Sequence, residues 1–237
     1  MKFEFLQLSE TDSTNDYIKK IKQDTTEYIV IAERQTGGKG RLGRTFVSND
    51  GGLYLSISYT PAKHITPEQT LHYTAIAALA VKRVLTKLTD EKDLTFDIKW
   101  PNDIYLNGKK VCGILTEAVH ASGGFYIIFG IGVNLTNNIS RDISYASSIL
   151  ELTGISLDRV EVAQLISGEL IALLSENATD FTPYLSEYKD SCITIGKKVK
   201  TATVSGIVTD IDNKACLMVE TEDGKTETVF FGEAVEF

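Results

Sequence analysis

The helical patterns in this sequence stop near residue 190. Over residues 147–188 apolar side chains recur at three- and four-residue steps, which is typical of amphipathic helices. Over residues 192–237 only short strand-like runs remain, separated by turn-forming pairs such as Asp223-Gly224. A chain of 237 residues is long enough to build two cores. We therefore predict a large domain over residues 1–190 and a small antiparallel β-barrel over residues 191–237.

Strand-like and helical stretches alternate within the first 190 residues. Alternating or β-branched runs predict strands, and Asn107-Gly108 predicts the turn of a hairpin over residues 104–117. Pro67 is expected in the first turn of a long helix. The predicted strands cover residues 2–8, 28–32, 53–59, 95–99 and 124–135. The two long helices are expected to bury Leu71, Ile76, Leu79, Ala80, Val84 and Leu88, and Val160, Val162, Leu165, Ile166, Leu170 and Leu173.

The chain carries more acid than base. Its 24 basic and 32 acidic residues give a net charge of −8, so the whole surface repels nucleic acid and anionic membranes. The cysteines and histidines have neither disulfide nor zinc-ligand spacing, which predicts no metal site and a reducing compartment. No secretion signal or membrane-spanning run is recognisable, so we expect a cytoplasmic protein with no membrane partner. Structural or surface roles are predicted for Cys112, Cys192, Cys216, His64, His72 and His120.

A basic, glycine-rich loop is the first candidate site. Four glycines and four basic residues fall within the eleven positions Arg34–Arg44. Glycines let backbone N–H groups approach phosphate or carboxylate oxygens, while Arg and Lys supply positive charge. The loop does not match the P-loop pattern, and residues 130–134 lack the third glycine of a dinucleotide-binding fingerprint. Taken alone, the loop is an anion site or a flexible basic linker.

A second cluster surrounds the predicted hairpin. Asp103 precedes its first strand and Lys110 follows its turn, so the hairpin can bring a carboxylate and an ammonium group together. Alone, such a pair is more often a solvated surface pair. Ser13 and Thr14 are ordinary helix N-cap residues, and Asn134 is an ordinary residue at a strand end.

Taken in order, these segments resemble the catalytic domain of biotin protein ligases. The resemblance covers nearly the whole chain, and its most specific motifs are the basic loop and Lys99-Trp-Pro-Asn-Asp103. The matching segments are Asp12-Ser-Thr-Asn15, Gln35-Thr-Gly-Gly-Lys-Gly-Arg-Leu-Gly-Arg44, Lys99-Trp-Pro-Asn-Asp103, Gly108-Lys-Lys-Val-Cys-Gly-Ile-Leu-Thr-Glu117, Gly130-Ile-Gly-Val-Asn-Leu135, Ala146-Ser-Ser-Ile149 and Leu152-Thr-Gly154.

The resemblance implies an α+β fold. It consists of a mixed sheet with helices on one side, as in class II synthetase-like catalytic domains, and a small C-terminal SH3-like β-barrel that closes at Gly232-Glu233. Some relatives begin with a DNA-binding domain, but the first catalytic strand is expected at Lys2, so we expect no DNA partner. Lys39 stands where arginine is usual, which keeps the charge and removes the bidentate guanidinium.

The resemblance also implies the reaction. Biotin and ATP, with Mg²⁺ bound mainly through the ATP, would form biotinyl-5′-AMP, and a lysine of a biotin carboxyl carrier protein would then take the biotinyl group. Lys110, Arg41 and Asp103 are the implied catalytic residues. The implied biotin-binding residues are Ser13, Thr14, Asn15, Gln35, Gly38, Lys39, Gly40, Arg41, Lys110 and Gly113. The implied ATP-binding residues are Lys39, Arg41, Arg44, Asn102 and Asn134.

Two other functions fit parts of the sequence. A lipoate protein ligase would use a related fold and the same acyl-adenylate chemistry, although the glycine-rich loop and the small barrel favour biotin. A non-catalytic nucleotide- or nucleic-acid-binding module would use the basic loop without turnover, and the negative charge of the chain argues against nucleic acid. The sequence leaves the carrier unidentified and leaves monomer and homodimer both open.

Overall fold

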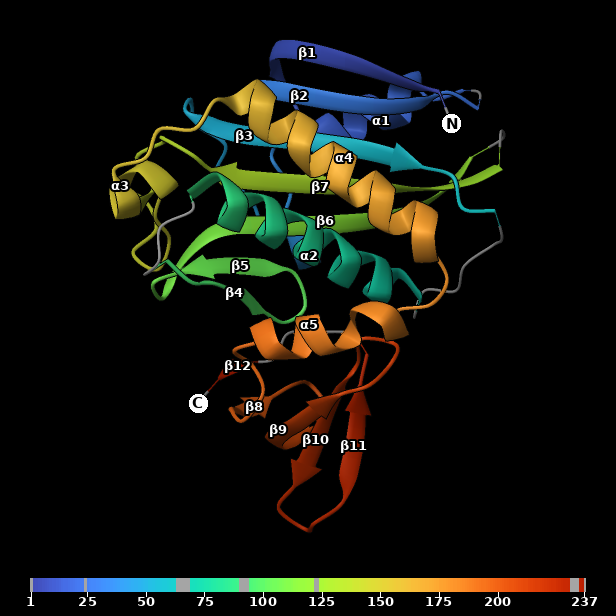
Figure 1. Cartoon of the computed structure of the whole chain (residues 1–237), viewed down its shortest axis with the longest axis vertical. Helices are drawn as coiled ribbons and strands as arrows, with labels where there is room; N and C mark the ends of the chain where they lie inside the picture. The colour runs from blue at the N-terminus through green and yellow to red at the C-terminus, as the bar shows by residue number, and fades with distance from the viewer. Residues whose placement is uncertain are drawn as a thin grey trace.

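The computed structural model describes residues 2–23, 25–62, 69–89, 94–121, 124–230 and 235–236. Two sheets organise these residues, a seven-stranded sheet and a five-stranded sheet. In Figure 1 the larger sheet and its helices form the upper body, and the smaller sheet lies below them at the C-terminal end of the chain. The α+β fold class and the small C-terminal β-unit predicted from the sequence are both confirmed.

The large sheet is mixed. Its strand order is β1-β2-β3-β7-β6-β5-β4, with β1 and β2 parallel and every other neighbouring pair antiparallel. Most strands start or end within two residues of their predicted positions because alternation and β-branched residues mark them well. The strands are β1 Phe3–Thr11, β2 Glu27–Gln35, β3 Gly52–Tyr59, β4 Phe96–Lys99, β5 Asp103–Leu106, β6 Lys109–Ala121 and β7 Gly124–Asn134.

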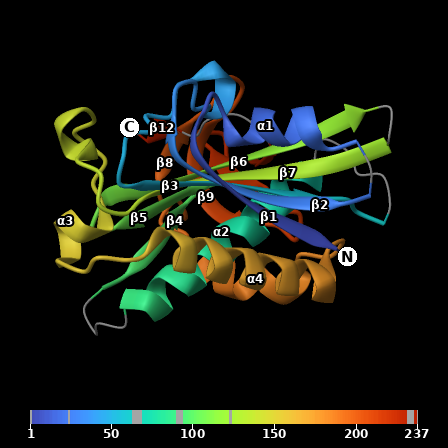
Figure 2. The ribbon, with the colours of Figure 1, turned by 90° about the horizontal axis from the view of Figure 1, so that it is seen from above.

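Two long helices cover one face of this sheet. Helix α2, Gln69–Thr89, and helix α4, Arg159–Asn177, lie side by side on that face, and every residue of α2 from Leu71 to Val81 is buried. Figure 2 shows α2 and α4 together on this face. Because α2 is covered on two sides, it buries more than the single stripe its periodicity predicted. Pro67 lies outside the described residues.

The buried face predicted for α4 is largely correct. Val162, Ile166 and Leu170 are buried, as is Leu173. Leu165 was predicted in this set and is instead 37% exposed. It occupies the outer side of the helix, so its apolar character misled a prediction made from spacing alone.

Short helices complete the large domain. Helix α1, Thr14–Ile21, lies on the opposite face of the sheet from α2 and α4, a placement that the sequence did not predict (Figure 2). Ser13 is its N-cap, with its hydroxyl accepting from the backbone N–H of Asp16 at 3.4 Å, as the sequence indicated. The remaining elements are α3 Ile149–Thr153, α5 Leu185–Ser191 and the 3₁₀ turns η1 Arg41–Gly43, η2 Ile139–Arg141 and η3 Thr182–Tyr184.

The hairpin between β5 and β6 carries an irregularity that the sequence did not reveal. Its turn is at Asn107 and Gly108, which have φ angles of +49° and +74°, as the Asn-Gly pair predicted. The strand register then shifts between Ile104 and Tyr105, which leaves Val111 as an extra residue in β6. Val111 and Cys112 are consequently both buried in the core, and Lys110 faces the opposite side of the sheet.

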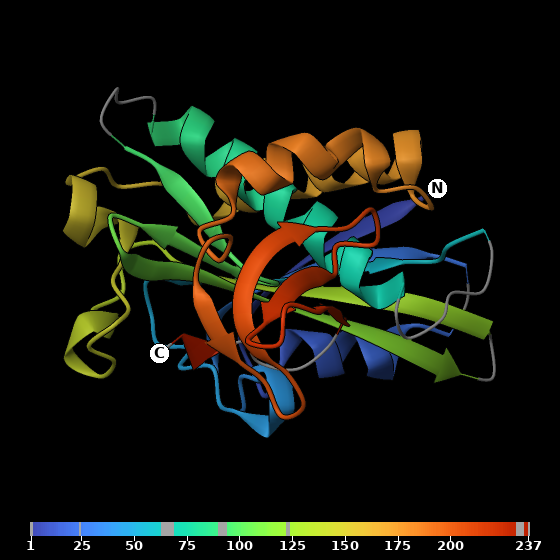
Figure 3. The same ribbon diagram turned by 90° about the horizontal axis from the view of Figure 1, so that it is seen from below.

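The small sheet is antiparallel, with strand order β11-β10-β9-β8-β12 (Figure 3). Its strands are β8 Lys198–Lys200, β9 Ser205–Ile211, β10 Leu217–Thr221, β11 Thr226–Val229 and β12 Val235–Glu236. The strand-like runs in the sequence, at residues 198–204, 206–211, 216–220 and 227–231, predict four of these strands, and β8 is shorter than predicted. The pair at β12 was not predicted, and Gly232-Glu233, expected to close the barrel, lies outside the described residues.

Trp100 joins the two sheets. Its indole N–H donates to the carbonyl of Ala215 at 2.8 Å, and its backbone N–H donates to the hydroxyl of Thr194 at 3.0 Å. Beside it, the backbone N–H of Ile193 donates to the carbonyl of Ile98 at 3.0 Å. Trp100 is only 4% exposed, so the small sheet is packed against the strand end that leads into Pro101-Asn102.

The cysteines and described histidines occupy ordinary structural positions. Cys112, Cys192 and Cys216 are buried free thiols. His72 is buried and stacks on Tyr73, whereas His64 lies outside the described residues. Among the helices of the described chain, none is both long and apolar enough to cross a membrane.

We predict that His72 makes stability depend on pH. Burial lowers the pKa of His72, although its hydrogen bond to the Ala178 carbonyl and the charge of Asp180 oppose that shift. The folded chain then binds a proton less readily than the unfolded chain, so the free energy of unfolding falls as pH drops below about 6.5. Urea unfolding of wild type and His72→Gln between pH 7 and pH 5 measures this effect. A wild-type slope that the substitution does not reduce contradicts it.

Candidate active site

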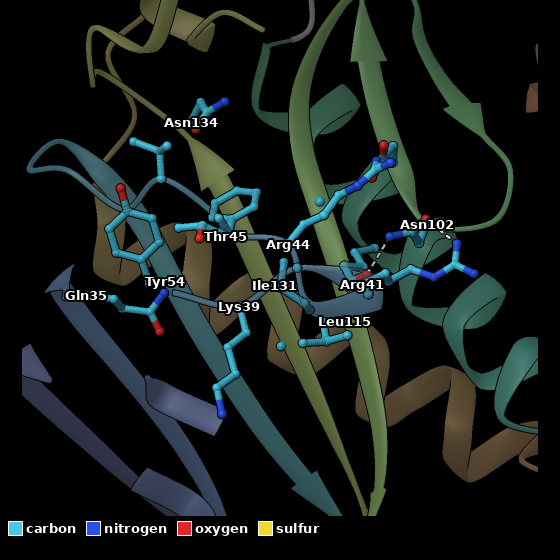
Figure 4. Close-up of a pocket in the computed structure, with 18 of the residues that line it drawn as sticks. Gln35, Lys39, Arg41, Arg44, Thr45, Tyr54, Asn102, Leu115, Ile131 and Asn134 are labelled. Carbon is cyan, nitrogen blue, oxygen red and sulfur yellow. Dashed lines mark hydrogen bonds between the residues drawn. The ribbon is translucent and has the colours of Figure 1, made fainter. Parts of the chain in front are cut away.

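A pocket opens on the face of the large sheet that carries α1. The residues around it come from α1, the glycine-rich loop, the β5–β6 hairpin, β3 and β7 (Figure 4). Thirteen of the predicted site residues line it: Ser13, Thr14, Asn15, Gln35, Lys39, Gly40, Arg41, Arg44, Asn102, Asp103, Lys110, Gly113 and Asn134. Segments more than 100 residues apart in the sequence therefore form one site, and the individual roles of these residues stay predictions.

Gly38 is the one predicted site residue that does not line the pocket. It is buried behind the loop, where an added Cβ would lie 2.4 Å from both the carbonyl oxygen of Phe46 and the hydroxyl of Ser48. Glycine is required there for close packing of the loop on itself. The biotin-binding role predicted for Gly38 therefore has no support from a pocket-lining position.

Glycines form the floor of the pocket. Gly130 and Gly132 alternate along β7 with core residues, so their missing side chains leave space on the site face. A Cβ on Gly132 would lie 2.4 Å from the ring of Phe46, and a Cβ on Gly113 would lie 3.0 Å from the same ring. Phe46 thus rests directly over the floor. No motif in the sequence marks Phe46 as a site residue.

The N-terminus of α1 is fixed to the sheet by polar contacts. The backbone N–H of Thr14 donates to the side-chain oxygen of Gln35 at 2.8 Å, and the Gln35 amide donates to the hydroxyl of Ser48 at 3.0 Å. Ser56 lies beneath, with its hydroxyl 2.7 Å from that of Thr14 and 2.5 Å from the oxygen of Asn15. Short polar groups therefore face the pocket from a rigid support.

The glycine-rich loop folds back on itself as a narrow hairpin. Phe46 donates its backbone N–H to the carbonyl of Gly38 at 2.9 Å, and Gly40 donates to the carbonyl of Arg44 at 2.7 Å. At its tip Leu42 has a φ of +55° and is 68% exposed. Leucine rarely adopts this left-handed conformation, so the tip stores strain of about 1 kcal/mol.

Arg41 reaches from the loop to the second motif. One of its guanidinium nitrogens donates to the side-chain oxygen of Asn102 at 3.1 Å, while the Asn102 amide donates to the carbonyl of Ile114 at 2.7 Å (Figure 4). Asn102 is thereby held between the loop and β6. The two segments that the sequence singled out separately are in direct contact.

Lys39 lies differently from Arg41. Its ammonium group is 2.5 Å from a carboxylate oxygen of Asp16 on α1, and its side chain is 49% exposed. Figure 4 shows it directed away from Arg41 and Arg44. Although burial favours the neutral acid, hydrogen bonds from Lys39 and Lys19 hold the pKa of Asp16 below its usual range. Lys39 thus connects the loop to α1.

Lys110 and Asp103 form an ion pair at the other end of the pocket. The ammonium nitrogen is 2.7 Å from the carboxylate, and both side chains are mostly buried. The backbone N–H of Lys110 donates to the carbonyl of Tyr145 at 2.9 Å, so residues 145–147 run beside it. The bulge in β6 is what directs Lys110 toward the pocket rather than into the core.

Asn134 lies at the rim, where β7 ends. It is buried, and its side-chain oxygen accepts a hydrogen bond from the amide of Asn137 at 3.1 Å. Aromatic and aliphatic residues that the sequence analysis did not single out complete the walls: Phe46, Val47, Tyr54, Leu115, Ile131, Ile139, Ile143 and Tyr145. Nothing in their spacing marks them, and the one signal that could have pointed to this wall is the pair of glycines at 130 and 132, since glycine within a strand often marks a close approach.

The arrangement suits an anion carried on an apolar body. Cationic groups, Arg41 and Lys110, approach from two sides, and the floor between them is glycine and aliphatic surface. Fixed positive charges in a partly dry pocket stabilise carboxylate and phosphate oxygens more than they could in water. Among the described residues no group of three or more His, Cys, Asp and Glu could hold a metal ion.

Comparison with known proteins agrees with this geometry. Residues 8–134 match the model of the biotin/lipoate A/B protein ligase family. The bifunctional ligase/repressor BirA of Bacillus spizizenii is 31% identical over 212 residues, which are 83% of this chain and 62% of that protein. This chain therefore spans less than two thirds of that relative's length. The biotin–[acetyl-CoA-carboxylase] ligase of Paracoccus denitrificans is 29% identical over 95% of this chain and 99% of its own length.

A solved structure has the same architecture. The biotin protein ligase of Aquifex aeolicus in complex with biotin and ATP aligns with a TM-score of 0.82 and 29% identity. The alignment covers 99% of this chain and 97% of that one. Both sheets are therefore part of the shared fold.

We predict that Gly130→Ala destabilises the fold. An added Cβ would lie 2.5 Å from the side-chain oxygen of Asn15, so the α1 N-terminus must shift, at a cost of about 1–3 kcal/mol. Gly168→Ala in α4 is the matched control because an added Cβ there meets nothing within 4 Å. The control should stabilise the helix by about 0.5–1 kcal/mol. Chemical denaturation measures both, and equal effects would contradict the prediction.

Proposed function

Because the chain belongs to the biotin/lipoate A/B protein ligase family, we propose that it joins biotin to a lysine of a biotin carboxyl carrier protein in an ATP-dependent reaction through biotinyl-5′-AMP. The observation that carries the proposal is the single glycine-floored pocket in which Arg41, Asn102, Asp103 and Lys110 meet the N-terminus of α1. This pocket offers separate surroundings for a polar ring, an apolar chain and a carboxylate.

The first step joins two anions. A carboxylate oxygen of biotin attacks the α-phosphorus of ATP, the bond to the β-phosphate oxygen breaks, and pyrophosphate leaves. Arg41 and Lys110 reduce the repulsion between carboxylate and phosphate, and Asp103 orients the Lys110 ammonium through their 2.7 Å contact. Asn102 holds the Arg41 guanidinium in position. We assign Arg44, Asn102 and Asn134 to the nucleotide, which also carries any Mg²⁺.

The second step transfers the biotinyl group. The neutral amine of a carrier lysine attacks the activated carbonyl, the bond to the phosphate oxygen breaks and AMP leaves, and the proton lost by the amine passes to Asp103 or to the departing phosphate. Asp103 is the carboxylate nearest this reaction and serves as base or as orienter of the incoming amine. The ion pair with Lys110 supports the orienting role, since the Lys110 ammonium already contacts one carboxylate oxygen of Asp103. Ser13, Thr14 and Gln35 face the end of the pocket that we assign to the ureido ring.

A lipoate ligase is the second candidate because the family model covers both acids. The Paracoccus denitrificans relative and the aligned structure are biotin ligases, which favours biotin. A non-catalytic binding module has less support, because it explains neither the Lys110–Asp103 pair nor the shared floor of the pocket.

Further assignments follow from the proposed function. We place the enzyme in the cytoplasm, without a membrane or DNA partner, and leave the homodimer as a prediction. The division into residues 1–190 and 191–237 is also a proposal. It is supported by the end of α5 at Ser191 and the start of β8 at Lys198.

We predict that Lys110→Ala lowers biotin-dependent ATP–pyrophosphate exchange by about 100-fold or more, because one preorganised cation is lost from the reacting centre. Lys109→Ala is the control, since Lys109 is exposed on the same strand, outside the pocket lining, and its ammonium group donates to the Ser144 carbonyl. Exchange with lipoate in place of biotin separates the two candidate acids. Absence of exchange with either acid would overturn the enzyme assignment.

We also predict that ligands protect the loop at residues 37–44. Its four glycines and strained tip make ordering costly without ligand, and closure would shield the adenylate from water. Trypsin should cut after Lys39, Arg41 or Arg44 faster in the free protein than with biotin and ATP together. Equal cutting rates in the two states would contradict the proposed closure of the loop.

A further inference from the structure

Glu117 lies in β6 beside the pocket and joins α1 to the sheet. One carboxylate oxygen accepts a hydrogen bond from the Lys19 ammonium at 2.9 Å, and the other accepts from the side-chain amide of Asn15 at 2.8 Å. Lys19 also pairs with Asp16 at 3.2 Å, and Asp16 pairs with Lys39 of the loop. Glu117 does not line the pocket itself, and Asn15 is the pocket-lining residue that it contacts directly.

The carboxylate of Glu117 fixes which way the Asn15 carboxamide points. A carboxylate can only accept hydrogen bonds, so it must face the NH₂ group of Asn15 and not the carbonyl oxygen. The oxygen of Asn15 then faces Ser56, whose hydroxyl lies 2.5 Å away. That hydroxyl can donate or accept, so it adapts to either orientation and selects neither.

The side chain of Asn15 has little room to move away from this orientation. Asn15 is 4% exposed, and its side chain lies against the backbone of Gly130, where an added Cβ would come within 2.5 Å of its oxygen. The second N–H and the second lone pair of the amide remain for a ligand in the pocket that Asn15 lines. The orientation of the amide therefore sets the polarity that this part of the pocket presents.

We propose that Glu117 is a positioning residue that holds the Asn15 carboxamide in one orientation and thereby sets the affinity of the pocket for the ring of the acid substrate. The inference rests on the proposed function, in which that ring is the ureido ring of biotin. Such a ring carries two N–H donors and one acceptor, so a turned amide would present a like group to it. This role is expected to affect neither the binding of ATP nor the transfer of the biotinyl group.

Glu117→Gln tests the proposal. The Lys19 ammonium should capture the new amide oxygen, because a charged donor is preferred, and leave the new NH₂ group facing Asn15. Asn15 must then turn. We expect the KM for biotin in ATP–pyrophosphate exchange, and the Kd from calorimetry, to rise about tenfold. The kcat and the KM for ATP should stay within about twofold of wild type.

A second substitution should reverse the first. In Glu117→Gln with Lys19→Met no ammonium competes, so the amide oxygen can turn back to Asn15, and the KM for biotin should recover to within about threefold of wild type. Lys20→Met is the matched control, since it removes an exposed ion pair of the same helix with Asp12. It should leave the KM for biotin unchanged.

The outcomes separate the inference from the proposed function. A wild-type protein with no biotin exchange would refute the proposed function. A wild-type protein that exchanges, with a Glu117→Gln variant of unchanged biotin KM, would refute the positioning role. A double variant weaker than Glu117→Gln would also refute it, because a merely structural role predicts additive damage.

Discussion

The site depends on a sheet that uses its two faces for different purposes. Along β7, Phe129 and Val133 enter the core on the side of α2 and α4, while Gly130 and Gly132 between them face the pocket. Strand alternation makes this division possible, because neighbouring residues point to opposite faces. The apolar face stabilises the sheet, so the other face can have a glycine floor without side chains of its own. α1, the loop and the β5–β6 hairpin are all arranged around that floor.

The segment Lys99–Asp103 connects this floor to the rest of the molecule. Trp100 is buried against Ala215 and Thr194 of the C-terminal unit, whereas Asn102 and Asp103 face the pocket. One short motif therefore contacts both the small sheet and the reacting end of the site. Asn102 is two residues from Trp100, so the packing of the C-terminal unit on Trp100 lies close in the chain to the pocket.

Charge is distributed around the pocket in a graded way. Lys110 and Asp103 pair at the reacting end, and Arg41 is held by Asn102 beside them. At the other end Lys39 pairs with Asp16 on α1 and so adds little positive charge where the ring is assigned. Lysine in place of the usual arginine fits this contact, since a compact ammonium suits one carboxylate. The chain as a whole has a net charge of −8, so these basic residues form a local positive region around the pocket.

The sequence by itself determined the strands, the long helices, the N-cap at Ser13 and the Asn107-Gly108 turn, because these depend on neighbours within a few residues. Resemblance to a family, and not local pattern, supplied the candidate site. Only the tertiary structure decided that α1 lies opposite α2, that Leu165 faces outward, and that Gly38 packs behind the loop. It also decided that a bulge turns Lys110 toward the pocket and that Glu117 holds Asn15. Those facts depend on contacts between segments up to about one hundred residues apart, which no local periodicity encodes.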